Sequence, residues 1–294
     1  MEKIPLTASA DSFAFAEYGG ACVGAPLQME EARVPDGLTL RRSQTMRGVP
    51  ENVADRLIVA LDVPSAREAQ DLVRRLDGVV SFFKIGLGLF FSEGVEALID
   101  NLVHAQKNVF LDYKMYDIGQ TVKNGVERAK QRGIKFVTVH GDKEIMQAAV
   151  EGRGDSSFLK VFSITVLTSL DDAALRDMGY ALTVEQLVER RVRGAIECGC
   201  DGIIASPLDR PDEIRKLSEH DGLLIATPGI RPSGHGANDH KRQATPAEAI
   251  MNGADYLIVG RPIIAVADPV RAAGAIIAEM LAADSERRQS RPRG

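Results

Sequence analysis

The chain has 294 residues, of which 45% are hydrophobic and 26% charged, so it is long enough to bury a large core without disulfides or metals. A net charge of −5 argues against a broad nucleic-acid or membrane-surface binder, and no apolar run approaches the ~20 residues of a membrane span. The three cysteines, Cys22, Cys198 and Cys200, lack the number and spacing of a secreted disulfide framework or a zinc site, which favours a cytoplasmic protein.

The two ends of the chain differ in character from its middle. Residues 1–55 carry scattered Gly, Pro and Ser without a sustained period, which predicts a poorly ordered extension. Alternatively, translation begins at Met46 and the preceding residues are an artefact of gene-start assignment. No basic segment followed by an apolar stretch marks a signal peptide. Residues 285–294 contain four Arg and one Glu without an apolar residue, so a flexible basic tail is expected there.

Between these ends, β-rich runs alternate with helical stretches. Strands are predicted at 56–62, 81–85, 108–114, 135–140, 158–165, 202–206, 223–227 and 256–260. Helices are predicted between them, including 65–76, 94–105, 120–132, 183–198 and 269–282, and Ser65 with Glu68 forms a capping box for the first. The alternation indicates parallel βαβ units, and eight of them favour a closed (β/α)₈ barrel as a single domain over residues 56–284.

Polar residues mark the carboxyl ends of the predicted strands, where catalytic groups of this fold lie. Charges at the ends of several strands would converge on one barrel mouth. Isolated charges of this kind are more often the start of a solvated loop, but several together favour an active site. The strand-end residues are Asp62, Lys84, Asp112, Lys114, His140, Thr165, Thr168, Ser206, Thr227, Gly260 and Arg261.

The densest cluster of charges lies at the end of the third strand. Strand side chains alternate between faces, so Asp112 and Lys114 are predicted to point the same way, into the barrel mouth. Asp117 is expected to begin the next helix, with Thr121 on the same helical face. A plain ion-pair network is the structural alternative, although charges at the interior end of a barrel are unfavourable unless they are paired or used.

The loops after the seventh and eighth strands are the usual phosphate site of this fold. Arg231 follows the seventh strand, and Gly260 with Arg261 follows the eighth; Gly permits close approach of the backbone and Arg offers bidentate contact. His235 and His240 lie in a Gly-rich loop with a spacing of five that matches no standard metal-ligand pattern. No metal is expected, and the loop is interpreted as contacting a nucleotide.

The run Asp112–Ile118 resembles the D-x-K-x-x-D signature of the orotidine 5′-phosphate decarboxylase suprafamily, which includes metal-dependent phosphosugar decarboxylases and aldolases. The strand Ile58–Asp62 and the residue Lys84 are similar to those of the orotidylate group. The runs Thr227–Pro232 and Gly260–Pro262 resemble its phosphate pattern, and the likeness covers about residues 55–282.

The resemblance implies a role for each matching residue. Lys84, Asp112, Lys114 and Asp117 would form an alternating charged network. Asp117 and Thr121 would reach into the neighbouring subunit's site, which implies a homodimer with shared active sites. The substrate-binding residues would be Asp62 at the ribose, Thr168 on the pyrimidine side, Arg231, Gly260 and Arg261 at the phosphate, and His240. The family usually has Gln where His240 stands, and this departure bears on substrate affinity and its pH dependence.

The implied reaction is the cofactor-independent decarboxylation of orotidine 5′-phosphate to uridine 5′-phosphate in de novo pyrimidine biosynthesis. Loss of CO₂ leaves a carbanion at C6, which Lys114 would stabilise and then protonate, while Asp112 would keep Lys114 charged and oriented. Two alternatives stay open. One is a metal-dependent phosphosugar enzyme of the same suprafamily, and the other is a catalytically silent phosphate-binding barrel.

Overall fold

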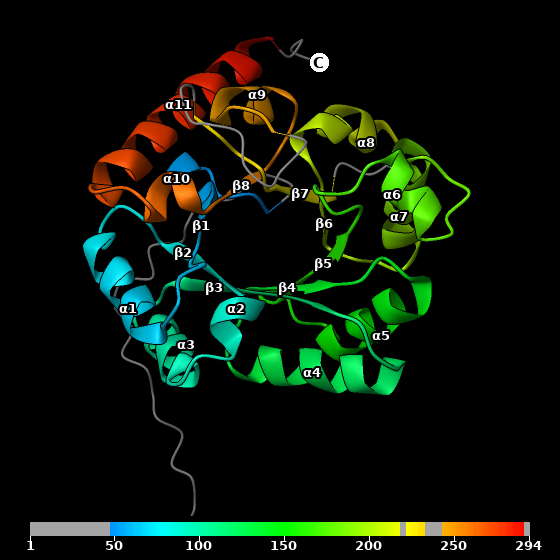
Figure 1. Cartoon of the computed structure of the whole chain (residues 1–294), viewed down its shortest axis with the longest axis horizontal. Coiled ribbons are helices and arrows are strands. Elements are labelled where there is room, and N and C mark those ends of the chain that lie inside the picture. Colours follow the sequence, from blue (N-terminus) through cyan, green and yellow to red (C-terminus); the bar gives the residue numbers. More distant parts are fainter. Residues whose placement is uncertain (1–47, 218–221, 233–242, 291–294) are drawn as a thin grey trace, which may run out of the picture. The chain divides into compact units, whose positions relative to one another are not determined.

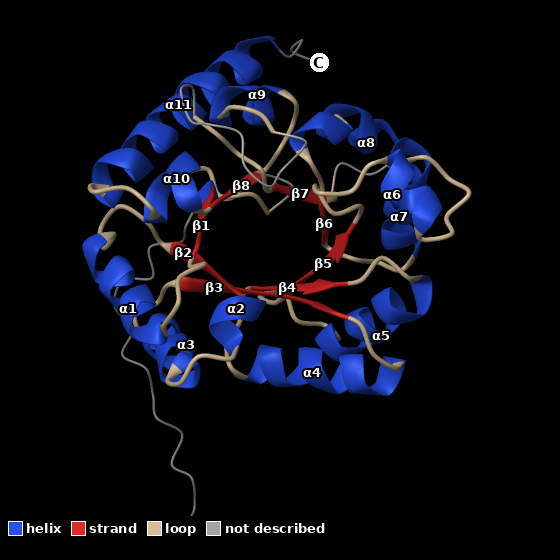
Figure 2. Ribbon diagram, viewed as in Figure 1, coloured by secondary structure: helices blue, strands red, loops and turns tan. Residues whose placement is uncertain are grey.

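The computed structural model describes residues 48–217, 222–232 and 243–290. In this part of the chain, eight parallel strands close into a barrel in their order along the sequence, and helices surround it (Figures 1 and 2). The (β/α)₈ barrel predicted from the alternation is therefore confirmed. The strands are β1 (Leu57–Ala60), β2 (Phe82–Gly86), β3 (Asn108–Met115), β4 (Phe136–Val139), β5 (Lys160–Ile164), β6 (Gly202–Ile204), β7 (Leu224–Thr227) and β8 (Tyr256–Val259).

The helices follow the strands in alternation, and the five predicted helices are all present. Short 3₁₀ turns precede β1 and follow β6, namely η1 (Val53–Arg56) and η2 (Pro207–Asp209). The helices are α1 (Ala66–Arg75), α2 (Leu87–Phe90), α3 (Val95–His104), α4 (Gly119–Gln131), α5 (Lys143–Arg153), α6 (Asp172–Asp177), α7 (Val184–Glu197), α8 (Pro211–Leu217), α9 (Pro246–Met251), α10 (Arg261–Ile264) and α11 (Pro269–Ser290). None of these described helices is long and apolar enough to cross a membrane.

The capping box predicted for α1 is only half formed. Ser65 Oγ accepts a hydrogen bond from the backbone N–H of Glu68 at 3.2 Å, as an N-cap does. The Glu68 carboxylate accepts from the Ser65 hydroxyl at 3.0 Å instead of from its backbone N–H. Reciprocal boxes form at α7, between Thr183 and Gln186, and at α9, between Thr245 and Glu248.

Residues before the predicted domain boundary at residue 56 contribute to the barrel core. Val49 and Val53 are both 3% exposed and belong to the hydrophobic core. Arg56, at the end of η1, is also buried; its Nε donates to the Asp255 carbonyl at 2.7 Å and its Nη1 pairs with Asp284 Oδ1 at 2.8 Å. Residues 48–55 are therefore a part of the barrel domain, because Val49 and Val53 pack in its core.

The prediction of a flexible tail from residue 285 is wrong for residues 285–290, which continue α11 to Ser290. Arg287 Nη1 donates to the Ile250 carbonyl at 2.9 Å, and Arg288 Nε pairs with Asp284 Oδ2 at 2.7 Å. The basic side chains that look like solvated charges in the sequence therefore anchor the last turns of the helix. Residues 291–294 lie outside the described part of the chain.

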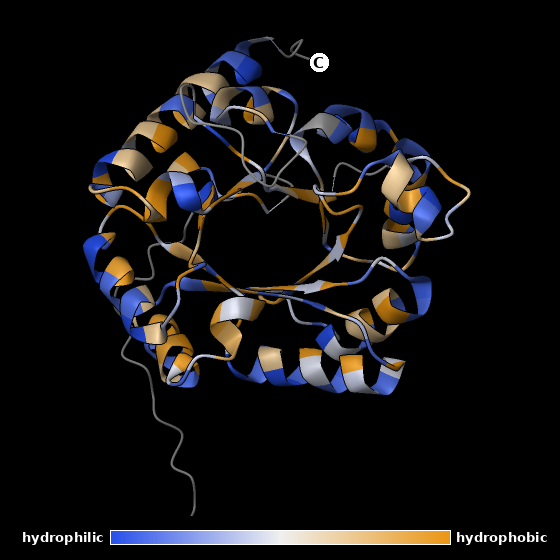
Figure 3. Cartoon of the chain, in the orientation of Figure 1, coloured by the Kyte–Doolittle hydropathy of each residue, from blue (hydrophilic) through white to orange (hydrophobic). Residues whose placement is uncertain are grey.

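The barrel interior is filled by a layer of aromatic side chains. The ring of Phe136 lies 4.4 Å from that of Phe162, 4.8 Å from Phe82 and 5.1 Å from Tyr256, measured between centroids. Gly202 leaves room for this layer, because a Cβ there would lie 2.4 Å from the Phe162 ring. Figure 3 shows apolar residues along the strands and the inward sides of the helices. The packed interior leaves the carboxyl ends of the strands as the place for a site.

Candidate active site

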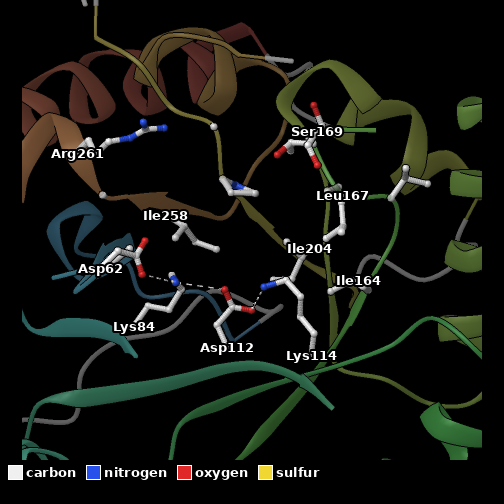
Figure 4. Close-up of a pocket in the computed structure, with 18 of the residues that line it drawn as sticks. Asp62, Lys84, Asp112, Lys114, Ile164, Leu167, Ser169, Ile204, Ile258 and Arg261 are labelled. Carbon is white, nitrogen blue, oxygen red and sulfur yellow. Dashed lines mark hydrogen bonds and ion pairs between the residues drawn. The ribbon is translucent and has the colours of Figure 1, made fainter. Parts of the chain in front are cut away.

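A cavity of about 580 Å³ lies at the carboxyl ends of the strands. This volume is in the usual range for sites that bind small molecules. Ala60, Ile164, Ile204 and Ile258 give it apolar walls, and the last three are labelled in Figure 4. The polar residues that line it are Asp62, Lys84, Asp112, Lys114, Thr168, Ser169, Ser206, Arg231 and Arg261.

Four charged side chains form a row of alternating sign along one side of the cavity (Figure 4). Lys84 Nζ lies 3.2 Å from Asp62 Oδ1 and 3.3 Å from Asp112 Oδ2. Lys114 Nζ lies 2.9 Å from Asp112 Oδ1. The sequence predicts that Asp62 contacts the ribose or helps to close the site. The structure shows in addition that Asp62 pairs with Lys84. The row joins the ends of β1, β2 and β3.

Burial and charge act in opposite directions on the two central members of the row. Burial by itself would raise the pKa of Asp112, but the charges of Lys84 and Lys114 and the hydrogen bonds from Lys114 and Thr138 outweigh it and hold that pKa below its ordinary value. Burial likewise opposes the charge of Lys84, whose pKa is nevertheless raised by Asp112 and Asp62. Both groups are therefore charged across the neutral range.

Lys114 reaches the cavity through an irregular backbone. The register between β3 and β4 shifts between Leu111 and Met115, and Lys114 has φ +48°, in the left-handed region. Simple alternation along a strand predicted the direction of Lys114 correctly, but a bulge rather than regular pleating produces it. The backbone N–H of Lys114 donates to Thr138 Oγ1 at 3.0 Å, and the Thr138 hydroxyl donates to Asp112 Oδ1, also at 3.0 Å.

The glycine at the end of β2 allows the ion pairs to form. A Cβ at Gly86 would lie 3.1 Å from Lys84 Nζ and 3.2 Å from Asp62 Oδ1. Such contacts are tighter than the usual separation and would push the Asp62 and Lys84 side chains apart. The role of Gly86 does not follow from the sequence, because it depends on the approach of β1 to β2.

The residues predicted to hold phosphate, Arg231, Gly260 and Arg261, also line the cavity, and Figure 4 shows Arg261 well apart from Lys114. Gly229 has φ +80°, a conformation that favours glycine, and carries the chain from β7 to Arg231. The backbone of Arg231 is fixed by its N–H, which donates to the Ala244 carbonyl at 2.9 Å. Gly260 is the N-cap of α10, and Arg261 begins that helix. His235 and His240 lie outside the described residues.

The loop after β5 supplies a third part of the cavity wall. Val166, Leu167, Thr168 and Ser169 all line the cavity, in agreement with the expected position of Thr168. The loop starts from a fixed point, because Thr165 Oγ1 donates to the Ile204 carbonyl at 2.8 Å. Thr165 itself, like Thr227 at the end of β7, is buried and does not line the cavity.

Three further residues singled out from the sequence, Asp117, Thr121 and His140, do not line the cavity of this chain. Asp117 is exposed and lies before α4, so it neither starts the helix nor shares a helical face with Thr121 as expected. Its Oδ1 accepts from the backbone N–H of Ile118 at 2.7 Å. Thr121 is exposed in the first turn of α4, and His140 pairs with Asp142 at 2.9 Å. The network within one chain is thus completed by Asp62 rather than by Asp117.

Thr138, Gly86 and Ser169 are site residues that sequence reasoning missed. Thr138 stands two residues before His140 on a strand, so its inward direction follows from alternation. A polar residue at an inward position was the available signal. Within the described ranges, no group of three or more His, Cys, Asp or Glu side chains is arranged to hold a metal ion.

The barrel and the charged cavity at the carboxyl ends of its strands have the architecture of a (β/α)₈-barrel enzyme. Residues 55–276 match the model of the orotidine 5′-phosphate decarboxylase / HUMPS family. Orotidine 5′-phosphate decarboxylase of Rhodopseudomonas palustris is 49% identical over 234 residues, which are 80% of this chain and 98% of that protein. The enzyme of the same name from Caulobacter vibrioides is 48% identical over 76% of this chain and 97% of its own length.

A solved structure agrees with these sequence matches. The crystal structure of orotidine 5′-phosphate decarboxylase from Lactobacillus acidophilus superposes with a TM-score of 0.67 and 33% identity, over 77% of this chain and 99% of that one. The chain belongs to the orotidine 5′-phosphate decarboxylase / HUMPS family.

Proposed function

We propose that this protein decarboxylates orotidine 5′-phosphate to uridine 5′-phosphate without a cofactor, as a step of pyrimidine biosynthesis. The observation that carries the proposal is the ion pair of Lys114 with Asp112 inside the cavity, at 2.9 Å. The relatives named orotidine 5′-phosphate decarboxylase, at 48–49% identity, favour this substrate over the phosphosugars of the other family members. We also propose that it acts in the cytoplasm, which agrees with the free thiols of Cys198 and Cys200.

The chemistry needs a fixed positive charge at the carbon that loses CO₂. When the bond from C6 to the carboxylate breaks, its electron pair stays on C6, and the Lys114 ammonium stabilises that carbanion. Lys114 then transfers a proton to C6, which forms the new C–H bond and leaves a neutral amine that solvent reprotonates. Asp112 orients Lys114, and Lys84 holds Asp112 from its other carboxylate oxygen, at 3.3 Å.

The substrate lies across the cavity in this proposal. Gly260, Arg261 and Arg231 hold the phosphate, because an arginine fork matches phosphate oxygens and a glycine admits close approach of the backbone. Asp62 contacts the ribose, and Thr168 contacts the pyrimidine from the loop after β5. His240, outside the described residues, completes the binding set. The separation of Arg261 from Lys114 in Figure 4 supports a ligand that spans both groups.

We propose further that the protein is a homodimer whose subunits share their active sites through Asp117 and Thr121. Asp117, just before α4, and Thr121, in its first turn, are both exposed, and neither lines the cavity of its own chain. The residues on either side of Asp117 are large, apolar and exposed, Tyr116 at 66% and Ile118 at 72%. Nearby, Phe91 is 82% exposed beside Phe90, whose ring packs on Tyr113 of β3 at 4.6 Å. An apolar surface of this kind fits a second copy of the chain.

A complementation experiment tests the shared site. Lys114→Ala and Asp117→Ala homodimers are expected to be inactive separately. After unfolding and refolding together, half of the dimers are mixed, and each mixed dimer holds one intact site. Activity should therefore return to about a quarter of the wild-type value. No recovery, with mixed dimers present by mass spectrometry, would place Asp117 in its own subunit's site.

The reaction itself is tested by the fall in ultraviolet absorbance when the purified protein meets orotidine 5′-phosphate, with and without EDTA. Rapid turnover that EDTA does not affect is the expected result. No turnover would overturn the proposal, and the next substrates to measure would be phosphosugars with added magnesium.

A further inference from the structure

The hydroxyl of Thr138 lies between two parts of β3 that carry the charged row. The side chain is on β4 and fully buried, at 0% exposure. Its Oγ1 accepts from the backbone N–H of Lys114 at 3.0 Å and donates to Asp112 Oδ1 at 3.0 Å. These directions are unambiguous, because an N–H can only donate and an ionised carboxylate can only accept. One hydroxyl therefore bonds the backbone of Lys114 and the side chain of Asp112 at the same time.

The backbone of Lys114 needs such support. A lysine at φ +48° is in the left-handed region, which is unfavourable for a residue with a Cβ. The regular ladder does not hold Lys114, because the register between β3 and β4 shifts between Leu111 and Met115. Strained conformations of this kind persist only where surrounding contacts determine them, and the bond from Lys114 N–H to Thr138 is such a contact.

The second bond of Thr138 acts on the partner of Lys114. Asp112 Oδ1 accepts from both Lys114 Nζ, at 2.9 Å, and the Thr138 hydroxyl, while its Oδ2 faces Lys84. The carboxylate is thus held from both oxygens, and its Oδ1 is aimed at the ammonium. Loss of the hydroxyl would release the Lys114 backbone and one side of the Asp112 carboxylate together.

We infer that Thr138 is a positioning residue for the decarboxylation, which fixes the Lys114 ammonium by holding the bulge of β3 and the Asp112 carboxylate. The inference rests on the proposed function. Thr138 does not line the cavity, so it acts through Lys114 and Asp112 and not by contact with the substrate. A group of this kind should influence the chemical step far more than substrate binding.

The test compares Thr138→Val, which keeps the branched shape and removes the hydroxyl, with Thr138→Ser, which keeps the hydroxyl and removes a methyl group. A hydrogen bond to a charged group corresponds to a loss of about tenfold to a hundredfold in rate. We therefore expect kcat of Thr138→Val to fall by about tenfold to a hundredfold while KM stays within about threefold. Thr138→Ser should recover most of kcat, although it leaves the larger gap in packing.

A merely structural role gives a different pattern. It predicts that the serine variant is damaged at least as much as the valine variant, because only serine loses buried volume. That result, or a wild-type kcat in Thr138→Val, would overturn the inference. If the valine variant does not fold, Thr138→Ala takes its place, and a kcat of Thr138→Ala equal to that of Thr138→Ser would overturn the inference, because only the serine variant keeps the hydroxyl.

A crystal structure of the valine variant decides the question without an activity measurement. A changed φ at Lys114, or an Nζ that has left Asp112, is expected. An unchanged Lys114 would overturn the inference. Failure of the wild-type protein to decarboxylate orotidine 5′-phosphate would instead overturn the proposed function, and the variant structure would still test the role of Thr138.

Discussion

Replacement of Lys114 by alanine separates the chemistry of the site from the stability of the fold. The change removes the ammonium from the cavity and, with it, the group proposed both to stabilise the carbanion and to protonate it. Loss of an electrostatic stabiliser costs about 10²–10³ in rate, and loss of a general acid costs about 10²–10⁴. If the two effects act independently, their lower bounds multiply, so we expect turnover to fall by at least about 10⁴-fold.

The same change should leave the fold almost intact. The Lys114 side chain is 34% exposed and forms one ion pair with Asp112, which retains Lys84 at 3.3 Å and Thr138 at 3.0 Å. A partly exposed pair contributes about 0–1 kcal/mol, so the free energy of unfolding should fall by no more than ~1 kcal/mol. For a domain of this size that corresponds to about 2–4 °C in Tm.

Two measurements on the same preparation check these values, the absorbance fall with orotidine 5′-phosphate and thermal unfolding followed by circular dichroism. Lys107→Ala is the control. It also removes a lysine from an ion pair, with Asp77 at 2.6 Å, but at the amino-terminal end of β3, away from the cavity. The control should keep wild-type turnover. Activity of Lys114→Ala within about a hundredfold of wild type would refute its assignment as proton donor.

Two predictions concern stability. Asp284→Asn should lower the free energy of unfolding by about 3 kcal/mol at pH 7, because it leaves Arg56 buried without its counter-charge. Burial opposes the charge of Asp284, but Arg56 holds the pKa of Asp284 in the folded protein below its value in the unfolded chain. The ion pair therefore contributes its full share of stability above the unfolded pKa, about 3.9. That share is lost as the pH falls through the folded pKa. Denaturant unfolding from pH 7 to pH 3 should show the difference between wild type and variant shrink; a constant difference would contradict this. Gly202→Ala should lower stability strongly or prevent folding, because the added Cβ would lie 2.4 Å from Phe162 and 2.7 Å from the Leu224 carbonyl. A melting temperature of the variant within about 2 °C of wild type would contradict this prediction.

Much of the barrel can be predicted because its pattern is local. A buried parallel strand needs a short run of apolar residues, and the helix that follows needs an amphipathic period, so each unit can be recognised from its own residues. The strand ends are less predictable. β1 stops at Ala60 although the apolar run continues, because Asp62 has left the ladder and turned into the cavity. The ends of the domain depended on distant partners, as the bonds of Arg56 to Asp284 and of Arg287 to the Ile250 carbonyl show.

The charged row shows the same division. Asp62, Lys84, Asp112 and Lys114 could be recognised as a set because strand ends meet at one rim of a barrel, whatever the details of packing. The pairing of Asp62 with Lys84 could not be predicted from the sequence, since it depends on the register of β1 against β2 and on the absence of a Cβ at Gly86.

The sequence by itself determined the order of strands and helices, the rim on which the charges meet and the family signature, because all of these follow from short-range periodicity and spacing. Only the tertiary structure decided how Lys114 is held. Its left-handed backbone depends on the hydroxyl of Thr138, which lies 24 residues further along the chain and on another strand. No local preference of a lysine favours that conformation, so it arises only once β3 and β4 are packed together.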